Sequence, residues 1–169
     1  MKRSITILHI KKKNLLWDQC DNLSKVSKQL YNVGLYTLRQ GLVKEDRWIS
    51  SKELYDTMKL NENWILLPRK VSNQVWRQVN SSWSSWLKAL KAFAKSPKGF
   101  LGRPKMPKYQ SDRNIVVYEK GALGIRGLKK GFLRLSQTDI IFDSMGLDVV
   151  EVKIPVSYTH LTLPTILLV

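Results

Sequence analysis

The chain has 169 residues, and its 29 Lys and Arg against 13 Asp and Glu give a formal net charge of +16. Its 43% hydrophobic residues, with six Trp and six Tyr, are enough for a core and exclude a fully disordered chain. The single cysteine, Cys20, excludes an internal disulfide framework and a cysteine-built zinc site, and no stretch reaches the ~18 apolar residues that a membrane span needs.

The first expected elements are a strand and a helix. Residues 3–10 place apolar side chains on both sides of an extended chain, which favours a strand buried on both faces. Asp21 or Asn22 is suited to cap a following helix that runs to about Gln40. Gly41 suits the exit of that helix.

Two further helices are predicted before residue 100. Ser50 and Glu53 have the spacing of a capping box, so a helix is expected from about Ser51 to Leu60. A longer helix of about seven turns begins near Pro68 and ends before Pro97. Its apolar seam recurs at three- and four-residue steps: Val71, Val75, Val79, Trp83, Trp86, Leu87, Leu90 and Phe93.

The positive charge is concentrated in residues 68–113, which carry eleven basic side chains and one acidic one. Such a density indicates a polyanionic partner, and we expect nucleic acid. A solvated basic face without a partner is the plain alternative. An anionic membrane fits less well, because the aromatic residues of the segment are spaced to face a core.

Residues 96–110, SPKGFLGRPKMPKYQ, are expected to form an extended basic loop, because three prolines deny it helical or ladder hydrogen bonds. Proline also stiffens the loop, so that its cations are presented to phosphates at low entropic cost. Tyr109 and Phe100 are candidates to stack on bases, although Phe100 is better suited to anchor the loop.

After Asn114 the pattern changes to period two and indicates strands at 114–119, at 124–136 around a Lys-Lys-Gly turn, and at 147–154. The lone first strand needs sheet partners, and these strands supply them. The expected fold is therefore α+β, with a small β-barrel or sheet that a helical insertion splits after its first strand.

Side chains that could carry chemistry are few. Asp139, Asp143, Asp148 and Glu151 could in principle hold a metal ion for a nuclease, but turn carboxylates of this kind are usually solvated. No histidine pair, nucleophile triad or phosphate-binding glycine loop is recognisable, so no active site is expected. Side chains suited to binding are more numerous. Three amides on the long helix could reach base edges, and the alternative is that they only make its polar face soluble: Asn73, Gln74 and Gln78.

Three segments carry a resemblance to a known family. YNVGLYTLRQ (31–40), LPRKVSNQVWRQVNSSWSSWLKAL (67–90) and GRPKMPKYQ (102–110) follow one another in the order found in the N-terminal part of TnpB. TnpB is a transposon-encoded, RNA-guided DNA endonuclease long described as a transposase, and it is similar to type V CRISPR effectors. The resemblance covers about residues 1–155.

The resemblance implies a WED-like barrel and a helical insertion that hold a guide RNA from the transposon end. It also implies that they read a short motif in double-stranded target DNA, before a downstream RuvC-like domain cuts. Mg and Zn are expected only in that domain, which has no counterpart in this sequence, so this fragment is expected to be inactive, without a cofactor or small-molecule substrate. The residues that best match nucleic-acid contacts are Lys70, Gln74 and Arg77 on the helix, and Arg103, Lys105 and Lys108 on the loop.

The resulting division is a first strand at 1–12, a helical insertion at 13–100, and the basic loop with the remaining strands at 101–155. Residues 156–169 carry no charge, and VSYTHLTLPT resembles the translated read-through of an adapter from transposon-based sequencing libraries. We expect this tail to be an artefact, and the parent protein to be prokaryotic, cytoplasmic and nucleoid-associated. The alternative is a stand-alone basic DNA- or RNA-binding protein without nuclease activity.

Overall fold

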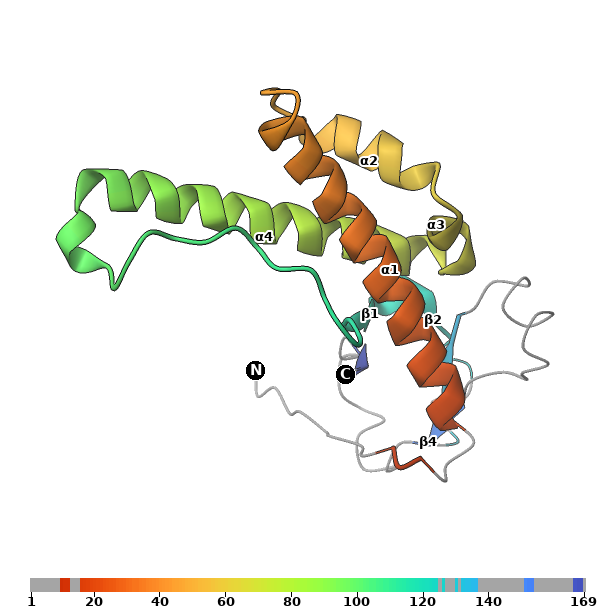
Figure 1. The fold of residues 1–169 in the computed structure, drawn as a ribbon. Coiled ribbons are helices and arrows are strands. Elements are labelled where there is room, and N and C mark those ends of the chain that lie inside the picture. The colour runs from red at the N-terminus through yellow and green to blue at the C-terminus, as the bar shows by residue number, and fades with distance from the viewer. Residues whose placement is uncertain are drawn as a thin grey trace.

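The computed structural model describes residues 10–12, 16–124, 126, 130, 132–136, 151–153 and 166–168. The fold is α+β and mostly helical (Figure 1), as expected from the sequence. The helices are α1 (Leu16–Val43), α2 (Ser51–Lys59), α3 (Glu62–Leu66) and α4 (Arg69–Lys95), followed by the short 3-10 helices η1 (Pro97–Gly99) and η2 (Lys120–Ala122). The strands are β1 (Val116–Tyr118), β2 (Leu123–Gly124), β3 (Phe132–Leu135), β4 (Glu151–Lys153) and β5 (Ile166–Leu168).

Helix α1 begins earlier than the sequence predicts. It starts at Leu16, so Asp21 lies inside the helix and is not its cap. The Asp21 carboxylate instead forms two ion pairs. One is with Lys25, 2.6 Å away and one helical turn later, and the other is with Arg113, 92 residues later in the sequence. The helix also continues past Gly41, which belongs to the last helical turn and packs closely on Ile49.

The Ser50 cap of α2 and the helix predicted after it are confirmed, while the Glu53 carboxylate pairs with Arg47. The Ser50 hydroxyl accepts a hydrogen bond from the backbone N–H of Glu53 at 3.1 Å, and the helix follows at once. A second cap directly after α2 was not predicted: the Asn61 side chain accepts from the N–H of Asn63 at 3.0 Å and starts α3. Residues 62–66, for which no element was predicted, thus form a short helix.

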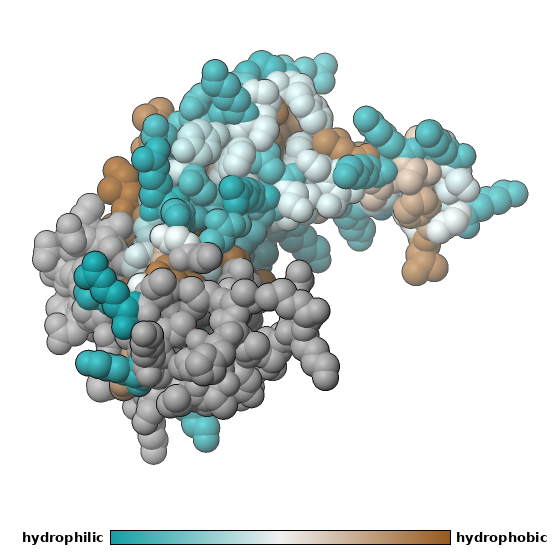
Figure 2. All heavy atoms as spheres, turned by 180° about the vertical axis from the view of Figure 1, so that it is seen from behind, coloured by the Kyte–Doolittle hydropathy of each residue, from teal (hydrophilic) through white to brown (hydrophobic). Residues whose placement is uncertain are grey.

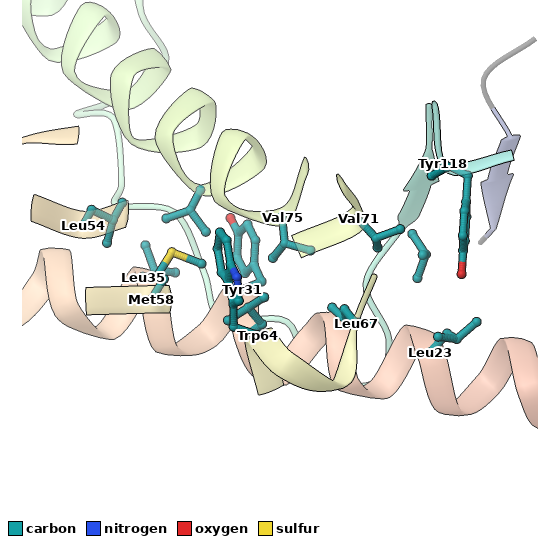
Figure 3. Packing of buried hydrophobic residues seen from close by; sticks show 14 of the residues in the cluster. Leu23, Tyr31, Leu35, Leu54, Met58, Trp64, Leu67, Val71, Val75 and Tyr118 are labelled. Carbon is teal, nitrogen blue, oxygen red and sulfur yellow. The ribbon is translucent and has the colours of Figure 1, made fainter. Parts of the chain in front are cut away.

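The core lies where α1 crosses α4, with α2 and α3 closing one side (Figure 3). At Gly34, helix α1 packs tightly on α2 and α4, since a Cβ there would lie 2.7 Å from Met58 Sδ of α2 and 3.2 Å from Val79 Cγ2 of α4. A side chain at this position would push the helices apart. The largest fully buried side chains of the described residues are Tyr118, Leu23, Leu30, Leu35, Leu54, Met58, Leu67 and Leu135, with Val71, Val75 and Val79.

The fully buried part of the α4 seam ends at Trp83; Trp86 and Leu87 still pack against the core, and the seam beyond Leu87 lies outside it. Val71, Val75, Val79 and Trp83 are buried, whereas the later members of the same apolar seam are half-buried. Figure 1 shows the second half of α4 extending away from α1, α2 and α3, with the following loop running back beside it. The expectation that the aromatic residues of this segment face a core is thus correct for the proximal turns and wrong for the distal ones.

The strands form two small antiparallel sheets, one of β1 with β5 and one in the order β2-β3-β4. Leu123 pairs with Leu135, so strands on the two sides of the predicted Lys-Lys-Gly turn are antiparallel neighbours, as predicted. Phe132 pairs with Lys153 of β4. Residues 3–9 of the predicted first strand lie outside the described residues, and the barrel stays a prediction. Strand β5 (Ile166–Leu168), which pairs with β1, lies in the tail that was predicted to be an artefact. This pairing does not test whether the tail comes from an adapter.

No helix among the described residues is both long and apolar enough to cross a membrane.

Candidate nucleic-acid interface

One face of α4 carries polar side chains from Lys70 to Lys95, interrupted only by Ala92. Positions at steps of three and four residues fall on the same side of a helix, and here they define what we call the α4 stripe. All its side chains are exposed except Gln74, which is half-buried. The helix contains no Asp or Glu. The α4 stripe consists of Lys70, Gln74, Arg77, Ser81, Ser85, Lys88, Ala92 and Lys95.

The middle of the α4 stripe borders a shallow groove of about 560 Å³. Its floor and walls offer hydroxyls, amides and one guanidinium, with a single apolar residue from β1. Hydroxyl and amide groups of this kind can donate to phosphate oxygens or to base edges. The lining residues are Gln74, Arg77, Gln78, Ser81, Ser82, Ser85 and Val117.

Two of the three helix residues proposed from the sequence share this groove. Gln74 and Arg77 line it, and the side-chain nitrogen of Gln74 is buried without a hydrogen-bond partner among the described residues. Lys70 lies one turn earlier on the same stripe, outside the groove, with its Nζ against Gly121. The structure therefore places the three on one face, with Lys70 at its end.

Arg77 already has a partner. Its Nη1 lies 3.0 Å from Oε1 of Glu119, which follows β1, and both side chains are about half exposed. An ion pair in such a setting contributes little to stability because water screens it. This pair was not predictable from local sequence, since 42 residues separate its members.

Gln78, one of the amides that could reach a base edge, makes hydrogen bonds within the fold. Its Nε2 donates to the backbone oxygen of Ile115 at 3.2 Å, and its Oε1 accepts from Asn114 at 2.9 Å. Asn114 is buried and also donates to Ser27 Oγ on α1 at 3.1 Å. Both hydrogen-bonding ends of the Gln78 amide are thus used to hold the end of the loop between α1 and α4.

The loop predicted over residues 96–110 is extended after η1, but the prediction was wrong for Pro97–Gly99, which form that 3-10 helix. Side chains of both long helices hold the backbone of the extended part. Trp86 Nε1 of α4 donates to the oxygen of Pro104 at 3.2 Å, and Arg39 of α1 donates to the oxygen of Pro107. Asn32 exchanges two hydrogen bonds of 2.9 Å with the backbone of Gln110. The loop is therefore attached to the fold at several points along its length.

The three loop cations proposed from the sequence remain exposed on this held backbone. Arg103, Lys105 and Lys108 take part in no ion pair within the part of the chain that the structure describes. Because the backbone under them is fixed, these cations can meet a row of phosphates with little loss of chain entropy.

The last cation of the segment, Arg113, is used internally. It pairs with Asp21 and Asp112, and its guanidinium lies over the ring of Trp17 at 5.6 Å. Hydrogen bonds from Lys25 and Arg113 lower the pKa of Asp21, and the Asp21 carboxylate in turn raises the pKa of Arg113. Arg113 thus fastens the loop to α1.

The two aromatic residues of the loop are also placed by neighbours. Phe100 packs edge-on against Phe93 with ring centroids 5.7 Å apart, which agrees with its expected anchoring role, although the anchor is the distal end of α4. The ring of Tyr109 is covered on one face by the Arg39 guanidinium at 4.5 Å, while 42% of the residue stays exposed. Tyr109 therefore keeps a surface on which a base could stack.

Among the described residues, no three His, Cys, Asp or Glu side chains lie close enough together to hold a metal ion. Asp139, Asp143 and Asp148 lie outside the described residues, and of Glu151 only the backbone in β4 is described.

Sequence reasoning missed several parts of this surface. Ser81 and Ser85 were not singled out, although their spacing from Gln74 and Arg77 would have placed them on the same face.

Comparison of the chain with family models, with curated proteins and with solved structures finds no match in any of the three.

Proposed function

We propose that the chain binds nucleic acid along the α4 stripe and along the loop after η1 (residues 100–113), which we call the return loop. We further propose that it is the guide-RNA- and target-DNA-binding N-terminal part of a TnpB-like RNA-guided endonuclease, whose cutting domain lies elsewhere. The observation that carries the binding proposal is the free cations on both elements, with no carboxylate on α4 itself. The TnpB assignment rests on the three matching sequence segments.

The dimensions of the surface support a duplex. From Lys70 to Lys95 the α4 stripe rises about 38 Å at 1.5 Å per residue. This is close to one helical turn of B-form DNA, about 34–36 Å. Cations near both ends of the stripe and hydroxyls between them would then meet successive phosphates. The half-buried amide of Gln74, with a nitrogen that lacks a partner among the described residues, is the side chain best suited to a base edge.

The test is a fluorescence titration of labelled 20-nucleotide single strands and duplexes at several salt concentrations. If about six phosphates are neutralised, the slope of log affinity against log salt is roughly −4 on single strands and −5 on duplex. A slope near zero contradicts the proposal.

A matched pair of variants locates the surface. Arg103→Gln with Lys105→Gln should reduce the salt slope by about 1.5 and weaken binding at low salt. Lys44→Gln with Lys52→Gln removes the same charge from the exposed junction of α1 and α2, and should change both quantities much less. Equal effects of the two pairs would show that net charge alone drives binding.

The nuclease ancestry has its own test. The source locus can be amplified and resequenced across codons 150–170 and onward in frame. A frame that leaves this sequence near Val156 and continues into a RuvC-like domain supports the assignment. A genome that encodes VSYTHLTLPTILLV followed by a stop favours the stand-alone binding protein.

A further inference from the structure

The distal end of α4, η1 and the start of the return loop form a projection, which we call the arm (residues 86–105). Figure 2 shows hydrophobic atoms at the end of this projection among hydrophilic ones. The most exposed large apolar residue in the described chain, Leu101, is fully in water, and its neighbour Phe100 is 37% exposed.

Local contacts hold the tip of the arm in place. Gly99 N–H donates to the oxygen of Ser96 and Phe100 N–H to the oxygen of Pro97, each at 3.2 Å. The Phe100 ring is seated on Phe93 of α4. The residue after the leucine, Gly102, has open space around its Cα, since a Cβ there would meet no atom within 4 Å. Leu101 is therefore presented outward by a fixed turn.

The surroundings of Leu101 are cationic. Lys98 and Arg103 flank it in sequence, Lys95 ends the helix below it, and residues 84–111 contain no Asp or Glu. Single exposed leucines are common on protein surfaces and mean nothing by themselves. Leu60 is such a case: it is 87% exposed at the end of α2, between Lys59 and the acidic Glu62.

We propose that Leu101 is a wedge that enters a double-stranded DNA between two base pairs while Lys98 and Arg103 hold the phosphates on either side. This inference rests on the proposed nucleic-acid binding. An aliphatic side chain has no ring to stack on an unpaired base, but proteins insert leucine between base steps, where it unstacks and kinks the duplex. The fixed turn lowers the entropic cost of insertion, and the cations select a polyanion as the occupant.

The experiment places 2-aminopurine, whose fluorescence rises on unstacking, at successive positions of a 20-base-pair duplex. The full chain is added to saturation at low salt, and affinity is measured at the same time. We expect a rise at one or two adjacent steps. Leu101→Ser should abolish most of the rise and weaken binding roughly tenfold, with an unchanged salt slope, because the phosphate contacts remain. Leu60→Ser should match the wild type.

Saturable, salt-dependent binding without a 2-aminopurine signal overturns the wedge and leaves the proposed function intact. An equal signal from Leu101→Ser also overturns it. If vesicles with anionic lipid bind in a Leu101-dependent way while the DNA signal is flat, the occupant is a membrane and the wedge is wrong. If the wild type fails to bind any nucleic acid, the proposed function fails first.

Discussion

Arg77 Nη1 lies 3.0 Å from Glu119 Oε1, so the guanidinium in the middle of the α4 stripe is neutralised by a carboxylate from the end of β1. In the proposed complex, a phosphate would compete with Glu119 for this guanidinium. The pair is half exposed, and surface pairs of this kind are worth about 0.2–1 kcal/mol, so a phosphate can displace the carboxylate.

Glu119→Gln is therefore expected to strengthen nucleic-acid binding by about two- to fivefold at low salt, because it removes the competing carboxylate. The salt slope should steepen by about 0.8 as Arg77 takes up a further phosphate. Fluorescence titration at several salt concentrations measures both changes.

The matched control is Glu45→Gln, which removes the same charge from an exposed carboxylate paired with Arg47 at 3.2 Å. It should leave the slope unchanged. In the double variant Arg77→Gln with Glu119→Gln the gain should disappear. A gain of the same size in Glu45→Gln would mean that net charge, and not the pair, limits binding.

Asn114→Ala should destabilise the fold by about 1–3 kcal/mol, because Gln78 Oε1 loses its donor in a buried setting. The loop end should stay in place, because the backbone N–H of Asn114 still donates to Ser24 and Ser27 Oγ still donates to Ile115, so DNA binding should change little. Urea denaturation measures the first effect. Asn80→Ala is the control, since its side chain bonds only its own helix at Trp76 and should alter stability by less than about 0.5 kcal/mol.

How far the sequence could be interpreted depends on whether the partners are local. Ser50 and Glu53 lie three residues apart, so their cap was predictable and is confirmed. Asp21 is an equally good capping residue, but it lies inside α1 and pairs with Lys25 one turn on and with Arg113, 92 residues away. The spacing to Lys25 is local, whereas no local pattern reveals Arg113. The predicted start of α1 was wrong, because the helix begins at Leu16.

The candidate site shows the same division. Period and spacing place Gln74 and Arg77 on one face of α4, and the structure agrees. Spacing could not reveal that Gln78, on the same helix, is held by Ile115, nor that the seam beyond Leu87 leaves the core. A periodic stripe predicts that a helix has an apolar side; what covers that side is decided by the rest of the chain.

Gly34→Leu should cost about 2–3 kcal/mol or more of folding free energy, because Met58 and Val79 already occupy the space beside this glycine. Thermal and urea unfolding measure the loss. Gly102→Leu is the control with the same chemical change, since nothing lies within 4 Å of a Cβ there. It should stay within about 0.5 kcal/mol of the wild type. Equal losses at both positions would contradict the close packing of α1 on α2 and α4.

Stability should fall at alkaline pH because burial raises the pKa of the half-buried Cys20 thiol from 9.0 to about 11 and raises the pKa of Tyr118 still further. Both groups stay protonated in the folded chain at a pH where the unfolded chain releases their protons. The stability that Cys20 contributes is therefore present below pH 9 and lost as pH rises from 9 through 11, whereas the contribution of Tyr118 begins to be lost only above pH 10.

Two measurements check this linkage at Cys20. Urea denaturation at pH 7, 9, 10 and 11 should show a shallower alkaline decline for Cys20→Ala than for the wild type. Iodoacetamide at pH 8 should modify native Cys20 roughly 100-fold more slowly than the urea-unfolded chain, because the thiolate is the reactive form. Equal alkylation rates in the folded and unfolded chains would contradict the burial of this thiol on the core side of α1. An unchanged decline in Cys20→Ala would assign the alkaline loss to Tyr118 alone.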